Sequence, residues 1–178
     1  MNVVGAPDIS FVGERVTLES VVEFDSSGAL TLHEIPITIP PAGAGSFEVV
    51  GDGDFGASFE WAVVTAEARH IGTIGGVGGD CVPTFGIFPV DADTVAAFVD
   101  DGVVSVEVQN SNNVDTLSSA NAHTVRLSYD AQRDSLDYGK VFVGQTATRS
   151  TTLLNFGSER LDVHLISTDV PAFVSSTT

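Results

Sequence analysis

Apolar and polar residues alternate along most of the chain in short runs. The runs "SFEVV", "FEWAVV", "VVSVEV" and "TVRLSY" repeat with a period of two, which is the spacing of side chains on the two faces of a β-strand. In the last run Val125, Leu127 and Tyr129 fall on one face, while Arg126 and Ser128 fall on the other. This pattern predicts half-buried strands from one end of the chain to the other.

Turn residues separate these runs and decide the fold class. Eighteen glycines and seven prolines interrupt the chain, which removes long helices from consideration. Ile35, Ile37 and Ile39 predict one face of a further strand. Many short strands with turn signals at roughly 8 to 12 residue intervals indicate an all-β protein, an antiparallel β-sandwich of jelly-roll type.

One segment, "DADTVAAFVDDG", leaves two interpretations open. As a helical turn or two, it would be capped by Asp91 or Asp93, and Val95, Phe98 and Val99 would fall at i, i+3 and i+4. The same segment also fits a strand.

A polar stretch, "SYDAQRDS" at 128–135, predicts a boundary. It divides the chain into a β-sandwich domain over residues 1–130 and a shorter β segment over residues 131–178. The shorter segment is small for an independent all-β domain.

The second segment carries a recognisable series of residues. They stand in "LDYGKVFVGQT", in "TTLLNFGSERLDV" and in a final "FV", and they are Leu136, Tyr138, Gly139, Val141, Val143, Gly144, Leu153, Asn155, Gly157, Leu161, Val163 and Phe173. This series resembles the first half of the Hydin-type, major-sperm-protein-like immunoglobulin domains that recur in bacterial surface proteins. The resemblance covers the last quarter of the chain and implies a non-catalytic scaffold or interaction role.

The later strands of that family are absent here, and three strands cannot close a sandwich. The missing sheet is expected from the large domain, from a neighbouring subunit that adds strands, or from the rest of a longer repeat protein. The apolar residues expected to make such contacts are Val141, Val143, Leu153, Leu161, Val163 and Leu165.

Composition narrows the partners. The 178 residues are 43% hydrophobic and include 24 acidic against 7 basic side chains, for a net charge of -17. Affinity for nucleic acid and for anionic membrane surfaces comes largely from Lys and Arg, so neither is an expected partner. The expected partners are therefore other proteins, copies of the chain itself or a carbohydrate.

The ends and the single cysteine bear on location. The first residues lack a basic start followed by an apolar stretch, so no secretory signal is predicted. Cys81 is the one cysteine, which excludes an internal disulfide, and a small buried role is expected for it. An extracellular or virion-surface location is the expectation.

The run "GDGDFG" at 51–56 satisfies the G-x-G-x-x-G pattern of dinucleotide-binding turns. That site needs a helix after the turn, whereas "ASFEWAVV" predicts a strand, and the aspartates would repel phosphate. Calcium, which prefers oxygen ligands, is the better hypothesis. We expect Asp52, Asp54, Glu60 and Asp80 to form the site, and a plain acidic turn is the alternative.

Other candidate groups carry weaker patterns. The histidines, His33, His70, His123 and His164, have no metal-binding spacing and are interpreted as surface or interface side chains. Trp61 alternates with Phe59 and Val63, and core packing is preferred for it over stacking on a sugar.

No catalytic motif stands in the sequence, so an enzyme is not expected. The leading hypothesis is a structural or interaction module that assembles with itself or with neighbouring proteins on an exposed surface. The alternative is a calcium-dependent carbohydrate-binding or adhesion module.

Overall fold

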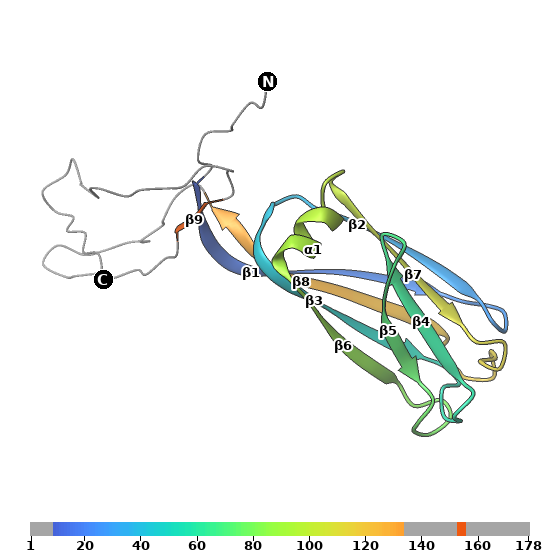
Figure 1. The fold of residues 1–178 in the computed structure, drawn as a ribbon. Helices are drawn as coiled ribbons and strands as arrows, with labels where there is room; N and C mark the ends of the chain where they lie inside the picture. Colours follow the sequence, from blue (N-terminus) through green and yellow to red (C-terminus); the bar gives the residue numbers. More distant parts are fainter. Residues whose placement is uncertain (1–8, 134–152, 156–178) are drawn as a thin grey trace, which may run out of the picture.

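A computed structural model describes residues 9–133 and 153–155, with side chains described for residues 14–132 (Figure 1). Sheet A holds, in spatial order, β6 (Thr84–Val90), β3 (Pro41–Asp52), β8 (Ala122–Arg133), β1 (Ile9–Glu23) and β9 (Leu153–Asn155). Sheet B holds β2 (Leu30–Pro36), β7 (Val103–Asn110), β4 (Trp61–Ala66) and β5 (Arg69–Gly75). Neighbouring strands are antiparallel throughout, which confirms the predicted all-β sandwich.

The core lies between the two sheets and follows the predicted alternation. Val125, Leu127 and Tyr129 of β8 are buried, as the sequence predicts, and they face the valines of β7. The buried valines of β7 are Val104, Val106 and Val108. Their burial removes apolar surface from water, which is the main favourable term in folding.

The segment with two interpretations is a helix, α1 (Ala92–Phe98). Asp91 is the N-cap, and its carboxylate accepts a hydrogen bond from the Thr94 backbone N–H at 2.9 Å. Val95 and Phe98 are buried on the side of α1 that packs against β3. The capped helix closes one end of the sandwich (Figure 1).

The prediction for Ile35, Ile37 and Ile39 is only partly right. Ile35 is buried, Ile37 is half-buried and Ile39 is exposed. The strand ends at Pro36, and two more prolines follow Ile39, so the alternation does not continue to that residue. The carbonyl of Ile39 instead accepts a hydrogen bond from the Tyr129 hydroxyl at 2.8 Å.

β8 runs on to Arg133 through most of the predicted boundary at 128–135. Beyond it, β9 pairs with β1, so that Leu153 lies opposite Phe11 and Asn155 opposite Ile9. These three residues of the second segment therefore extend sheet A. The division into two domains stays a prediction. The structure has no helix in the described ranges that is long and apolar enough to cross a membrane.

Two histidines lie fully buried between the sheets, so the interpretation of them as surface or interface side chains is wrong. Thr31 Oγ1 lies 2.8 Å from His123 Nδ1 and 3.1 Å from His33 Nε2. His33 Nδ1 lies 3.1 Å from the Ser20 hydroxyl, and His123 Nε2 lies 3.0 Å from Asn110 Oδ1. His70 is exposed, and His164 is outside the described residues.

These contacts can give both neutral imidazole rings a donor and an acceptor, in a chain of hydrogen bonds that all run the same way. One proton arrangement that satisfies all four contacts has Ser20 donating to His33, His33 to Thr31, Thr31 to His123, and His123 to the Asn110 amide oxygen. Burial lowers the pKa of His33, and burial together with the nearby His33 lowers the pKa of His123 to about 3. Both rings are therefore neutral at pH 7.

A glycine on β5 makes room for the aromatic ring that seals the β5–β6 side of the sandwich. A Cβ at Gly72 would overlap the ring of Phe88 on β6. We expect Gly72→Ala to lower the free energy of unfolding by about 1–3 kcal/mol, the usual cost of overpacking. Urea unfolding measures the change, and Gly43→Ala, where a Cβ meets nothing within 4 Å, is the control. Equal stability of the two variants would contradict the packing argument.

Candidate functional site

Three loops meet at the end of the sandwich away from α1 (Figure 1). They join β3 to β4, β5 to β6 and β7 to β8. The backbone N–H of Cys81 in the second loop donates to the carbonyl of Gly53 in the first at 3.1 Å. The Ser111 hydroxyl in the third loop donates to the carbonyl of Phe59 at 2.7 Å. The loops therefore support one another.

Carboxylates from two of these loops converge, and we call Asp54, Glu60 and Asp80 the acidic cluster. One carboxylate oxygen from each residue lies within 4.8 Å of the others. Asp54 and Glu60 are buried, and Asp80 is exposed. Glu60 also accepts a hydrogen bond from the Ala57 backbone N–H at 2.5 Å, which fixes its carboxylate.

The acidic cluster is electrostatically unbalanced. Burial raises the pKa of Asp54, and the charges of Glu60, Asp115 and Asp80 and a hydrogen bond with Asp115 raise it further. Among the described side chains, the ion pairs are those of Arg15 and Arg126, and neither involves the cluster. Buried carboxylates without a cationic partner are held either by protons or by a metal ion.

The separations of the three carboxylate oxygens can be compared with those around a calcium ion. Ca²⁺ takes about six to eight oxygen ligands at about 2.3–2.6 Å, so two ligands on opposite sides of the ion are about 5 Å apart. The 4.8 Å limit on the oxygen separations agrees with this span. Asp54, Glu60 and Asp80 are the residues that would hold the ion, and Asp115 adjoins them.

The fourth predicted ligand, Asp52, lies outside the acidic cluster. It is the last residue of β3, opposite Ala122, and it shares the outer face of sheet A with Glu48 and Val50. Asp54 comes after the strand has ended and is free of that alternation. Gly56 brings the loops together, because a Cβ there would overlap the carboxylate and backbone of Asp80.

Aromatic side chains stand beside the acidic cluster. Phe59 is 54% exposed and Trp61 is 38% exposed, so the prediction of core packing for Trp61 is wrong. Glu60 lies between them and points inward, in register with buried Ala62 and Val64. The alternation of β4, continued back through the two residues before it, thus places a carboxylate at the cluster and two aromatic rings in solvent. Cys81 is also exposed, and its sulfur contacts the Ser118 hydroxyl, so a buried role for it is wrong as well.

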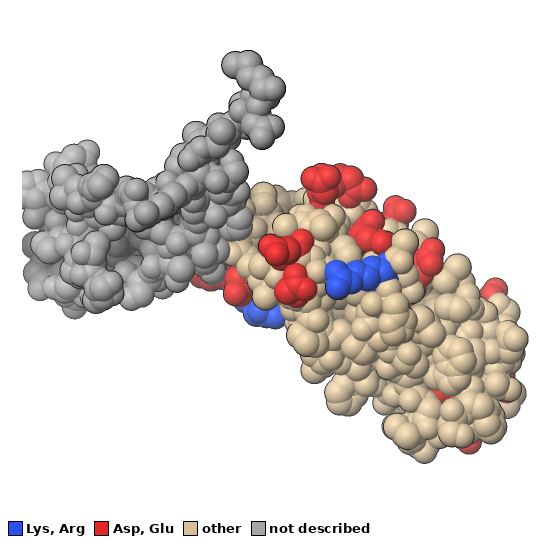
Figure 2. Space-filling model, viewed as in Figure 1, with Lys and Arg blue, Asp and Glu red and all other residues tan. Residues whose placement is uncertain are grey.

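A second notable surface lies along the edge strand β6. Phe85 is 69% exposed and Ile87 is 62% exposed, on the outer face of sheet A. In the view of Figure 2, acidic side chains gather toward α1, whereas the surface toward the lower right is almost free of charge. We call Phe85, Ile87 and Pro89 the β6 surface.

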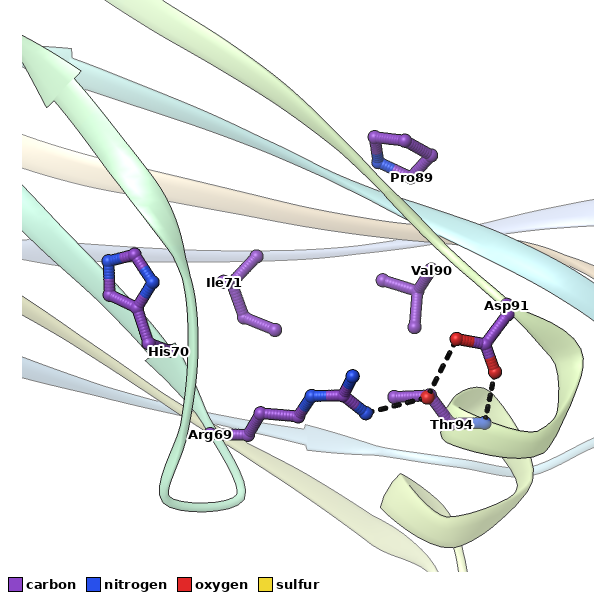
Figure 3. A pocket seen from close by; sticks show the side chains of 7 residues that line it. All are labelled: Arg69, His70, Ile71, Pro89, Val90, Asp91 and Thr94. Atoms are coloured by element: carbon purple, nitrogen blue, oxygen red, sulfur yellow. Dashed lines mark hydrogen bonds between the residues drawn. The ribbon is translucent and has the colours of Figure 1, made fainter.

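A groove of about 150 Å³ separates the start of β5 from α1 (Figure 3). Its lining consists of Arg69, His70, Ile71, Pro89, Val90, Asp91 and Thr94. Arg69 donates to Thr94 Oγ1 at 2.7 Å, and the Thr94 hydroxyl donates to Asp91 at 3.0 Å. These polar groups engage one another and tie the strand to the helix.

The interaction residues predicted in the second segment are described only in part. Leu153 opens β9 and extends sheet A beside β1. The others lie outside the described residues: Val141, Val143, Leu161, Val163 and Leu165.

A comparison with protein-family models and with curated proteins found no match for this chain. The resemblance to Hydin-type immunoglobulin domains therefore stays a prediction.

Proposed function

We propose that this chain is a non-catalytic interaction module that assembles with copies of itself or with neighbouring proteins on an exposed surface, cellular or viral. The observation that carries the proposal is the β6 surface, where two large apolar side chains stand in solvent on the edge strand of a sheet. Natural proteins usually protect such edges, and exposed apolar patches mark interaction sites.

The acidic charge of the chain favours association through the β6 surface over association through other surfaces. A net charge of -17 keeps copies apart wherever carboxylates face one another. The β6 strand, "TFGIFPV", contains no charged residue. Association through it avoids that repulsion and buries apolar surface.

Light scattering over a concentration series tests the proposal. We expect the mass of the full chain to rise with concentration, and more strongly in 500 mM than in 50 mM NaCl, since salt screens the repulsion between acidic copies. Phe85→Ser/Ile87→Ser is expected to shift the association at least tenfold to higher concentration. A basic protein partner would show the opposite dependence on salt.

The matched control is Leu30→Ser/Leu32→Ser on β2, the edge strand of sheet B, where both leucines are similarly exposed. It should associate as the wild-type chain does. A monomer at every concentration, or equal behaviour of the two double variants, would remove the support for this proposal.

The second candidate is a calcium-dependent carbohydrate-binding module, favoured by the exposed Phe59 and Trp61 beside the acidic cluster. Exposed aromatic rings provide an apolar face for a sugar, and bound Ca²⁺ would order the loops and supply a cation for hydroxyl groups. No cation partner for the cluster stands among the described side chains, which also favours this candidate.

Affinity electrophoresis through gels that contain soluble polysaccharides tests this second function. We expect retardation in CaCl₂, at least tenfold weaker binding for Trp61→Ala, and loss of retardation in EDTA. Leu117→Ala, a change at an exposed apolar residue of the β7–β8 loop, is the control. Retardation that is identical in EDTA, or that Trp61→Ala leaves intact, would exclude this function for the site.

A further inference from the structure

The free edge of β6 is the most unusual feature of sheet A. β3 pairs with one side of β6, and no strand in the described ranges pairs with the other. Edge strands are usually guarded by charges, by bulges or by a covering segment. β6 carries only Pro89 as a guard, and it presents Phe85 and Ile87 to solvent.

We infer that two copies of this chain pair their β6 strands antiparallel about a two-fold axis at Ile87, so that their sheets A join into one continuous sheet. The inference rests on the proposed function and names the partner and the geometry. In this register Ile87 faces Ile87 of the second copy, and Phe85 faces Pro89 of the second copy. The row of apolar side chains is therefore complementary to itself, as a two-fold interface requires.

The backbone of β6 allows this register at the cost of one hydrogen bond for each proline. A proline is accommodated in an edge strand when its nitrogen faces away from the neighbouring strand. Backbone N–H and C=O groups alternate in direction along a strand, so the N–H and C=O groups of Phe85 and Ile87, and the C=O group of Pro89, then point to the free edge. The two Ile87 residues exchange both hydrogen bonds, and each Phe85 N–H donates to the carbonyl of Pro89 in the other copy. Pro89 has no N–H to return, so each of the two Phe85–Pro89 pairs makes one hydrogen bond in place of two, and the seam has four backbone hydrogen bonds, the most that its two prolines allow.

Charges beside β6 allow the close approach of a second acidic chain. Val50 lies opposite Phe85 and Ser46 lies opposite Pro89 in the register with β3. The carboxylate opposite Ile87 is Glu48, which accepts a hydrogen bond from Arg126 at 2.6 Å. The centre of the proposed seam is therefore uncharged or paired, and the nearest further carboxylates, Asp52 and Asp91, lie at the two ends of β6.

Away from the groove near α1, the β5–β6 side of the interior is covered by Phe88, so the second copy contacts the edge and the outer face of β6. The ring of Phe88 lies against Gly72 of β5 and fills the space between the sheets. Strand pairing then leaves the core of each copy as it is, and folding and association are separable.

Disulfide trapping in a Cys81→Ser background tests this geometry. Directly opposed residues of antiparallel strands have Cα atoms about 4.5–5.5 Å apart, which lies within the range that a disulfide spans. Ile87→Cys is expected to form a covalent dimer at least tenfold faster than Leu32→Cys on β2, a similarly exposed position. Mild oxidation with copper phenanthroline and gel electrophoresis measure the rates.

A mixture provides a second measurement if the Ile87 variant folds poorly. Phe85→Cys and Pro89→Cys, made in chains of different tag length, should form the mixed dimer faster than either forms its own dimer. Equal rates, or no advantage of position 87 over position 32, would overturn the antiparallel pairing. If light scattering still shows assembly that Phe85→Ser/Ile87→Ser abolishes, the proposed function stands and only this geometry fails; a chain that stays monomeric overturns both.

Discussion

Lowering the pH from 7 to 4 is expected to reduce the free energy of unfolding by about 3 kcal/mol through His123 alone. The pKa of this ring is about 3 in the folded chain and 6.5 in the unfolded chain. Each pH unit between these values shifts the balance by about 1.4 kcal/mol toward the unfolded state, which binds the extra proton. The stability is complete above about pH 6.5 and is lost as the pH falls toward 3.

The physical cause is the one-directional hydrogen-bond chain between the sheets. Protonation would place an N–H at His123 Nδ1, where the Thr31 hydroxyl donates its own proton. Asn110 accepts at the other nitrogen, and the aromatic ring of Phe24 stacks on the imidazole at 4.8 Å. A charged ring would stand in a site without a carboxylate, and His33, whose pKa is also lowered by burial, acts in the same direction.

Urea unfolding of wild type and His123→Gln at several pH values isolates this contribution. The variant keeps a polar side chain beside Thr31 and loses the titrating group, so the slope of its stability between pH 6 and 4 should be about 1.4 kcal/mol per pH unit shallower. Leu117→Ala, at an exposed position without a titrating group, should keep the wild-type slope. Parallel curves for wild type and His123→Gln would show that the buried ring does not titrate in this range.

Alternation predicted the strands better than it predicted which face of each strand is buried. Along "FEWAVV", both faces are largely apolar, so the pattern does not choose between them. Ala62 and Val64 are buried, and Trp61 is exposed. β4 is an inner strand of sheet B, where small side chains fit between the sheets, and that position depends on pairing with β7 and β5.

The burial of His33 could have been predicted from the sequence, but its hydrogen-bond partners could not. Thr31, His33 and Ile35 share one face of β2, and burial of the isoleucine implies burial of the other two. The ring is tolerated there because Ser20 of β1 and Thr31 of β2 hydrogen-bond with it, and Thr31 in turn bonds to His123 of β8. Such contacts join residues up to 92 positions apart and leave no local spacing to read.

At the candidate calcium site too, the sequence predicted the residues of a local pattern and missed a residue that is brought in from a distant loop. Glycine and aspartate in "GDGDFG" predicted the loop, and Asp54, Glu60 and Asp80 do converge. Asp52 failed because strand β3 extends through it and directs it outward. Asp115 was missed because it arrives from the β7–β8 loop, in "NNVDT", without any characteristic spacing.

At pH 7, the order of stability of wild type and Asp54→Asn is expected to reverse when calcium replaces EDTA. In EDTA the variant should be the more stable of the two, because it removes one of several buried or crowded carboxylates that repel one another. In CaCl₂ at about 100 times the dissociation constant, wild type should gain about 3 kcal/mol from the bound ion. The variant, which lacks a buried ligand, should gain little.

Urea unfolding of both proteins in each buffer measures this crossing. Asp52→Asn is the control, since its carboxylate lies on the outer face of sheet A, and it should respond to calcium as wild type does. Gly56→Ala should weaken the response without removing a carboxylate, because its Cβ would push Asp80 away from the other two residues. If calcium stabilises wild type and Asp54→Asn equally, the ion binds elsewhere on the chain. The carbohydrate-binding candidate would then lose its calcium and depend on Phe59 and Trp61 alone.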